Sequence, residues 1–209
     1  MATEQATGTP TDPRVAGLKL VVGMAALMWV LEVVDVAADH RLDRYGIEPR
    51  EADGLLGILF APFLHVGFGH LAGNTVPFLA LGAGIALSGI ARVAIVTAIV
   101  GVVGGLGTWL TGSDNSVHLG ASGLVFGYAT YLISRGVFER NLVHLAVAAV
   151  VAAGYGGVLL GGILPEDGVS WQGHLFGAIG GILAARLLAS EEDRMHPRAR
   201  ARARREAAI

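Results

Sequence analysis

Four polar side chains in otherwise apolar stretches are of types that together could carry out nucleophilic catalysis. His70 and Asn74 are four residues apart in one stretch, and two later stretches carry Ser122 and His174. A hydroxyl nucleophile, an imidazole base and a carboxamide donor for an oxyanion are the parts of a serine hydrolase. If these stretches cross a membrane, each polar residue in them is a functional-site candidate, since lipid offers polar groups no water.

Charged residues are missing from three long parts of the 209-residue chain, residues 54–91, 93–113 and 115–134. Hydrophobic residues make up 53% of the sequence and charged residues 15%, against roughly a quarter in an ordinary soluble domain. Since a membrane-spanning helix needs about 20 mostly apolar residues, the composition predicts an all-α polytopic membrane protein. The chain contains no cysteine, which excludes thiol catalysis, disulfides and cysteine-based metal sites.

The apolar stretches predict six transmembrane helices in one membrane domain over residues 15–190. The expected helices cover residues 15–36, 69–88, 92–110, 121–134, 142–161 and 173–189. The apolar segment 54–68 contains Pro62 and Gly67, so we expect it to lie in or near the membrane interface. Residues 1–14 and 191–209 are expected to form two tails outside the membrane.

Basic residues gather at one set of predicted helix ends. They are Arg14, Lys19, Arg92, Arg135, Arg140 and the six arginines between Arg194 and Arg205. Because basic loops stay in the cytoplasm, both termini are expected to be cytoplasmic. The polar residues at 70, 122 and 174 then lie toward the outer leaflet, and the site opens to the extracytoplasmic side. The arginine-rich tail could also hold anionic lipid headgroups.

Ser122 lies at the start of an unusually short predicted helix. The apolar run from Leu119 to Ser134 would rise roughly 24 Å at ~1.5 Å per residue, less than the ~30 Å hydrocarbon core. The helix can therefore begin below the membrane surface, with Ser122 in its first turn, where free N–H groups favour a developing negative charge. Gly120 and Gly123 would keep the surroundings open. The alternative is that Ser122 only caps the helix.

His174 opens the last predicted helix, and Gly177 and Gly181 follow it on the same face. Small residues let helix backbones approach closely, which a hydrogen bond between Ser122 and His174 would require. A neutral imidazole could then act as the base, and Phe126 could stack against the ring. The alternatives are an interfacial histidine at position 174 and ordinary packing for Phe126.

His70 and Asn74 share one helix face, and both can donate a hydrogen bond to an oxyanion. The alternative is that they join helices by hydrogen bonds. For His65 we expect a structural role in positioning the first outer loop. For His118 we expect a solvated position in a loop, and the alternative is that it lines a path for water or substrate. The pair Gly157 and Gly161 is expected to serve helix packing.

Taken together, the motifs resemble those of the rhomboid family of intramembrane serine proteases. The matching segments are His70-Leu-Ala-Gly-Asn74, Gly120-Ala-Ser122-Gly123 and Gly173-His174-Leu-Phe-Gly177 with Gly181, and the resemblance covers about residues 15–190. It implies Ser122 as nucleophile, His174 as base, and an oxyanion hole formed by Asn74, His70 and the Ser122 backbone N–H. Phe126 takes the position of an aromatic that supports the base. Many members carry a Trp-Arg pair in the first outer loop, whereas residues 38–60 contain no tryptophan.

The resemblance implies hydrolysis of peptide bonds in or near transmembrane segments of protein substrates, in the inner membrane of a bacterium. The expected partners are these substrates and the lipid bilayer, without cofactor, metal or nucleic acid. One alternative is a non-catalytic rhomboid-like protein that binds membrane clients. A small transporter or channel is another, although it would need ionisable residues through both leaflets. A metalloprotease is disfavoured because the sequence has no His-Glu-x-x-His motif.

Overall fold

The computed structural model describes residues 12–166 and 168–189, and every regular element in this part of the chain is helical. The elements are α1 (Pro13–Ala37), η1 (Asp43–Tyr45), α2 (Gly54–Phe60), η2 (Ala61–Phe63), α3 (Gly67–Ala86), α4 (Ile90–Thr111), α5 (Ser122–Glu139), α6 (Leu142–Gly162) and α7 (Trp171–Leu188). The all-α prediction is therefore confirmed. The tail 191–209, with the arginines considered for lipid binding, lies outside the described residues.

Three helices, α1, α4 and α6, are long and apolar enough to cross a membrane. A fourth candidate is the pair formed by residues 54–63 and α3, which is bent by 73°. Each of the six predicted helices corresponds to one of α1 and α3 to α7, with ends shifted by a few residues. The described residues thus support a multi-pass membrane protein, and the count of six spans stays a prediction.

The segment predicted to lie at the interface forms two short helices, α2 and η2, that lead into α3. Pro62 stands in the first turn of η2, where its missing N–H is not needed. Gly67 is the first residue of α3 and has a φ of +86°. It lies at the sharp bend between η2 and α3. At Gly57 an added Cβ would lie 2.2 Å from the carbonyl oxygen of Gly46. The first outer loop therefore lies directly on α2.

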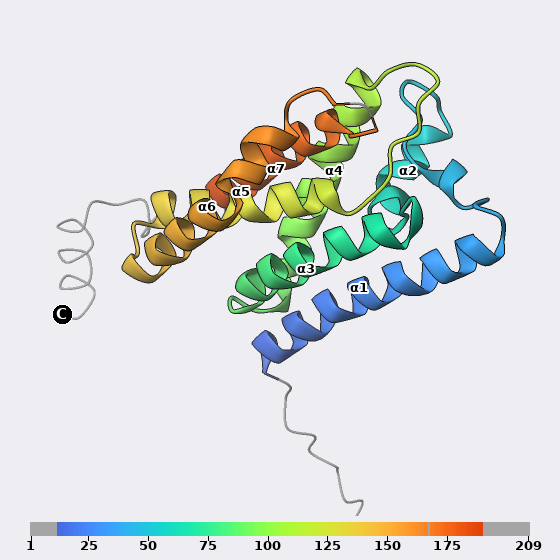
Figure 1. Ribbon diagram of the computed structural model, residues 1–209. Helices are drawn as coiled ribbons and strands as arrows, with labels where there is room; N and C mark the ends of the chain where they lie inside the picture. The colour runs from blue at the N-terminus through green and yellow to red at the C-terminus, as the bar shows by residue number, and fades with distance from the viewer. Residues whose placement is uncertain (1–11, 167, 190–209) are drawn as a thin grey trace, which may run out of the picture.

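Helices α5 and α7 lie side by side and form the centre of the bundle (Figure 1). An added Cβ at Gly177 would lie 2.3 Å from the Gly123 carbonyl oxygen, and one at Gly181 would lie 2.0 Å from that of Gly127. Only glycine permits so close an approach. By contrast, a Cβ at Gly157 or Gly161 would meet nothing within 4 Å among the described residues. The expected packing role of that pair is therefore wrong for this part of the chain.

The remaining long helices flank this centre. Helix α1 lies along α3, and α6 packs against α5 (Figure 1). Helix α6 buries only Ala148 and Val151. This helix is therefore the most loosely attached of the long helices in the described bundle, with most of its surface left for surrounding lipid.

Candidate active site

Ser122 and His174 are brought together by the close contact of α5 and α7. The Oγ atom of Ser122 and the Nε2 atom of His174 are 2.8 Å apart, within hydrogen-bond distance. Ser122 is the first residue of α5, and the capping position before it is occupied by Ala121 without a side-chain cap. The serine is therefore not the helix cap. The histidine is buried, with 8% of its surface exposed.

A backbone carbonyl determines which nitrogen of the His174 ring carries a proton. The Nδ1 atom lies 2.7 Å from the carbonyl oxygen of Gly162, at the end of α6. A carbonyl oxygen only accepts, so Nδ1 is the donor and the neutral ring keeps its lone pair on Nε2. That lone pair faces the Ser122 hydroxyl. Sequence analysis missed Gly162, because a main-chain acceptor has no residue type that would identify it.

Phe126 covers one face of the His174 ring. The two ring centroids are 4.1 Å apart and the planes differ by 6°, so the rings stack. Phe126 lies one turn after Ser122 on α5 and is 4% exposed. An added Cβ at Gly162 would lie 2.4 Å from the Cζ atom of Phe126. The Phe126 ring and the Gly162 backbone thus pack tightly around the imidazole of His174.

His70 and Asn74 lie beside the backbone that leads into α5. Gly120 has a φ of +118°, and an added Cβ there would lie 2.7 Å from the His70 Cε1 atom and 3.8 Å from the Asn74 Nδ2 atom. Asn74 is buried, and its amide donates one hydrogen bond of 3.2 Å to the His70 carbonyl oxygen. Its second amide proton has no acceptor among the described residues. The imidazole, the carboxamide and the start of α5 therefore form one polar corner.

His65 has the expected structural role, but at a different place. Its Nε2 atom accepts a 3.2 Å hydrogen bond from the backbone N–H of Ala121, the residue before Ser122. The ring is 1% exposed and meets His70 edge-on, with centroids 5.2 Å apart. His65 is structural, as predicted, but it holds the backbone before the serine and not the first outer loop.

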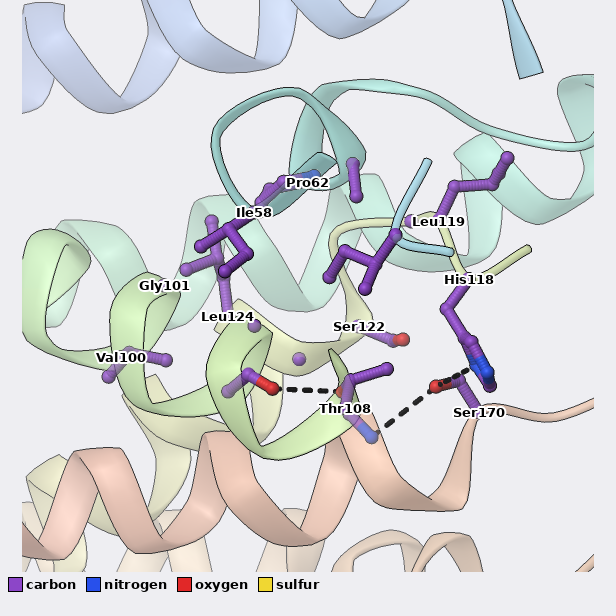
Figure 2. Close-up of a pocket in the computed structure, with 17 residues that line it drawn as sticks. Ile58, Pro62, Val100, Gly101, Thr108, His118, Leu119, Ser122, Leu124 and Ser170 are labelled. Carbon is purple, nitrogen blue, oxygen red and sulfur yellow. Dashed lines mark hydrogen bonds between the residues drawn. The ribbon is translucent and has the colours of Figure 1, made fainter. Parts of the chain in front are cut away.

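A pocket opens beside Ser122 on the side toward α2 and α4 (Figure 2). The space open to the centres of water molecules is about 50 Å³, and roughly 10–15 Å³ of such space suffices for one water. The wall includes Ile58, Pro62, Thr108 and Leu119 (Figure 2). A few water molecules can therefore lie next to the serine in an otherwise mostly apolar pocket.

His118 lines the same pocket and is half-buried, so the alternative of a residue beside a path for water fits it better than a solvated loop position. Its Nδ1 atom lies 2.8 Å from the Ser170 Oγ, and its Nε2 atom lies 2.9 Å from the Ser116 Oγ. Ser170 in turn caps α7 by accepting from the backbone N–H of Gly173. Burial lowers the pKa of His118. A neutral His118 thus connects the loop before α5 to the start of α7.

The first outer loop is anchored by Arg50 in the absence of a tryptophan from that loop. The Arg50 guanidinium donates to the carbonyl oxygens of Leu110 and Gly112, at 3.1 Å and 2.7 Å, and to the Asp114 carboxylate. Trp109 donates from its indole to the Glu51 carbonyl oxygen at 2.8 Å. An arginine and a tryptophan therefore do fix this loop, with the tryptophan at the end of α4.

The family model described as Rhomboid domain matches residues 52–191, more than half of the chain. The Mycobacterium tuberculosis protein named "Uncharacterized protein Rv1337" is 43% identical over 207 residues, which cover 95% of this chain and 86% of that protein. The Mycobacterium leprae protein named "Uncharacterized protein ML1171" is 44% identical over 187 residues, covering 85% and 73%. The Bacillus subtilis protein named "Putative rhomboid protease YdcA" is 30% identical over 147 residues, covering 69% and 73%.

Proposed function

Because this chain belongs to the rhomboid family, we propose that it is an intramembrane serine protease with Ser122 and His174 as its catalytic dyad. Its substrates are membrane proteins, cleaved in or near a transmembrane segment. The observation that supports this most directly is the 2.8 Å contact between the Ser122 Oγ and the His174 Nε2 atom. The contact matters because Gly162 leaves that nitrogen free to accept a proton.

In the first half of the reaction, His174 acts as general base and then as general acid. Its Nε2 atom takes the Ser122 hydroxyl proton while the Oγ atom bonds to the substrate carbonyl carbon, which gives a tetrahedral oxyanion. The imidazolium then donates this proton to the substrate nitrogen, the C–N bond breaks, and an acyl-enzyme remains. The Gly162 carbonyl stabilises the imidazolium because it accepts from Nδ1–H throughout.

The oxyanion is stabilised by three donors in this proposal. The first is the backbone N–H of Ser122, which stands in the first turn of α5, where N–H groups have no partner within the helix. The second and third are the Nε2–H of His70 and the free N–H of Asn74, both beside Gly120. Donors fixed in place before the reaction stabilise developing charge most effectively, since they need no reorientation.

Water from the pocket beside Ser122 completes the reaction. The His174 Nε2 atom takes a proton from a water molecule while its oxygen attacks the acyl carbon. The tetrahedral intermediate then collapses, the ester bond to Ser122 Oγ breaks, and that oxygen regains its proton from the imidazolium. The pocket is lined by residues of the first outer loop, α2 and α4 and has room for a few waters, which supports this route.

We further propose six membrane spans with both termini in the cytoplasm of a bacterium and a site that opens outside. The distribution of lysine and arginine along the sequence supports this orientation. Substrate would enter laterally past α6 and the loop at residues 163–170. The few buried side chains of α6 support that direction, because a loosely packed helix is displaced more easily than α5 or α7.

A serine-directed activity probe on the detergent-solubilised chain tests the proposal. The wild-type chain and Ser134→Ala, a control further along α5, should be labelled. Ser122→Ala should not be labelled and should not cleave a transmembrane reporter. His174→Ala should lose turnover as well, because the hydroxyl then has no base.

Labelling or reporter cleavage that persists in Ser122→Ala would refute the proposal. If the wild-type chain binds a reporter segment but neither labels nor cleaves it, the chain is a non-catalytic member of the family that binds membrane clients.

A further inference from the structure

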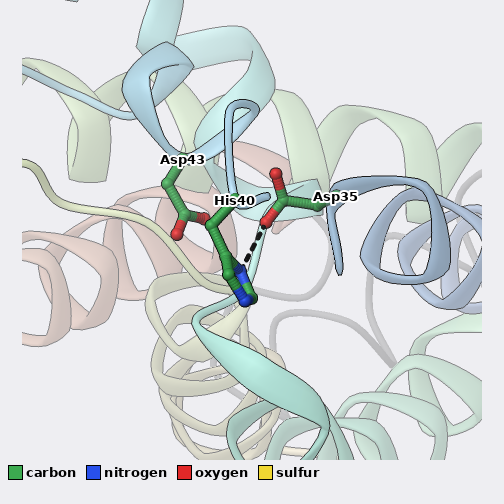
Figure 3. A group of neighbouring side chains, drawn as sticks. All are labelled: Asp35, His40 and Asp43. Carbon is green, nitrogen blue, oxygen red and sulfur yellow. Dashed lines mark hydrogen bonds and ion pairs between the residues drawn. The ribbon is translucent and has the colours of Figure 1, made fainter. Parts of the chain in front are cut away.

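Three metal-binding side chains gather where α1 ends, away from Ser122. They are Asp35 in the last turn of α1, His40 in the following turn and Asp43 at the start of η1 (Figure 3). One ligand atom from each lies within 4.8 Å of the others. Asp35 is buried, Asp43 is half-buried and His40 is exposed. Sequence analysis did not single out this cluster, because the three residues become neighbours only when the loop folds back.

The carboxylate of Asp35 is held in a fixed orientation. Its Oδ1 atom accepts a 2.6 Å hydrogen bond from the backbone N–H of Leu42, which directs Oδ2 toward His40 at 3.1 Å (Figure 3). The backbone N–H of His40 donates to the Asp35 carbonyl oxygen at 2.9 Å. The loop therefore closes over the end of α1 and presents the imidazole to the carboxylate.

A third carboxylate group, that of Glu32, interacts with all three side chains of this cluster and has no hydrogen-bond partner among the described residues. Glu32 lies three residues before Asp35 on α1 and is 2% exposed, and neither of its carboxylate oxygens has a hydrogen-bond partner in the described chain. The charged groups that act on Glu32 are Asp35, Asp43 and His40. The Gly67 N–H lies beside it but does not meet hydrogen-bond geometry.

Asp43 also has a carboxylate oxygen without a hydrogen-bond partner in the described part of the chain. Its Oδ1 atom is buried and lacks a partner among the described residues. Three carboxylates thus share one imidazole and no lysine or arginine among the groups that act on Glu32 or Asp43. Buried charge of one sign is unfavourable unless it is paired or coordinates a metal.

We propose that Asp35, His40 and Asp43 bind a divalent transition-metal ion, Zn²⁺ in the first place, with Glu32 balancing its charge. An imidazole nitrogen with two carboxylate oxygens is a ligand set suited to Zn²⁺, whereas Ca²⁺ and Mg²⁺ prefer oxygen alone. Two ligands of a tetrahedral Zn²⁺ are about 3.4 Å apart when each bond is ~2.0–2.1 Å. The 3.1 Å between Asp35 and His40 is near this spacing, and the ligand atoms of all three residues lie within 4.8 Å of one another.

The ion would join the end of α1 to the first outer loop. It lies outside the Ser122 and His174 pair, so its existence does not depend on the proposed proteolysis. The ion would replace any proton on the His40 Nδ1 atom, which would move to Nε2 or to solvent, and water on the exposed side of His40 would supply the remaining ligand.

Zn²⁺ titration of the full chain in detergent, freed of metal by a chelator, tests the site calorimetrically. The wild-type chain should bind one Zn²⁺, with much weaker binding of Ca²⁺ and Mg²⁺. His40→Ala and Asp43→Asn should each weaken binding roughly 100-fold or more, since loss of even an outer partner costs about 10–100-fold. Glu32→Gln should weaken Zn²⁺ binding by about 10–100-fold, as expected for an outer partner. Asp39→Asn, which removes an exposed charge from the same loop, should bind like the wild-type chain.

A matched thermal measurement separates lost binding from lost folding. Zn²⁺ should raise the Tm of the wild-type chain by mass action and leave that of Asp43→Asn unchanged. Without metal, Asp43→Asn should melt at or above the wild-type temperature, because it removes uncompensated charge. The site is refuted if wild-type binding does not saturate at one equivalent, or if both His40→Ala and Asp43→Asn bind Zn²⁺ as tightly as the wild-type chain.

Discussion

The Nδ1 atom of His174 lies 2.7 Å from the carbonyl oxygen of Gly162, which makes the tautomer of the ring depend on where α6 ends. The ring itself belongs to α7 and is stacked on Phe126 from α5. The position of the Gly162 backbone therefore affects the contact that His174 of α7 makes with Ser122 of α5. The loosely packed α6 is thus linked to the proposed catalytic pair through Gly162.

Gly162→Ala should slow cleavage of a transmembrane reporter while the chain stays folded. The new methyl group would lie 2.4 Å from Phe126 and 3.2 Å from the His174 Nδ1 atom, so the ring must move. A displacement near 1 Å can lower turnover by about 100-fold. The control is Gly161→Ala, whose methyl group meets nothing within 4 Å. Equal kcat values for both variants would contradict the role given to Gly162.

Asn74→Ala should lower kcat and leave KM nearly unchanged, because the carboxamide would act on the oxyanion and not on bound substrate. Loss of one such donor lowers kcat by up to roughly 10²–10³. Reporter cleavage at several substrate concentrations separates the two constants. Gly73→Ala, at the neighbouring open position of α3, serves as control. A rise in KM with unchanged kcat would instead assign Asn74 to substrate binding.

Gly181→Ala should destabilise the bundle. Its methyl group would lie 2.0 Å from the Gly127 carbonyl oxygen, so α5 and α7 must separate. Overpacking of this kind lowers the free energy of unfolding by about 1–3 kcal/mol. Thermal unfolding in detergent measures the loss, with Gly157→Ala as the matched helical control, since that position is open. If the two variants have the same Tm, the tight contact of α5 and α7 is not needed for stability.

His118 should make the chain less stable as the pH falls below neutrality. Burial holds the pKa of His118 below its usual 6.5, so the unfolded chain takes up a proton before the folded chain does. Stability is therefore fully present above about pH 6.5 and decreases as the pH falls through the folded pKa. His118→Gln cannot titrate, and its Tm should fall less steeply than that of the wild-type chain. Parallel curves would show that protonation of His118 is not coupled to folding.

The sequence predicts the helical part of this architecture well. Long apolar stretches identify α1 and α3 to α7 within a few residues, because lipid requires mostly apolar side chains along a span. The glycines at 177 and 181 likewise predict a close helix contact, and the structure shows it. The spacing of residues 70 and 74 also predicts a shared face, which lies beside Gly120.

Contacts made by loops and main-chain atoms could not be predicted in this way. The Gly162 carbonyl, the hydrogen bond from Ala121 to His65 and the guanidinium contacts of Arg50 depend on how distant segments pack. None of them follows a helical period, and a carbonyl group is common to every residue. The half-buried position of His118 was missed for the same reason, because its partner Ser170 is 52 residues away.

Ile47 and His118 exchange two backbone hydrogen bonds, of 2.8 and 2.9 Å. The pairing joins a surface segment resting on α2 to the peptide that leads into Gly120 and Ser122. The two segments must therefore shift as one unit. If the proposed proteolysis is correct, lipids of different acyl length, which would raise or lower α2 in the bilayer, are expected to change the cleavage rate by shifting the backbone that leads into Ser122.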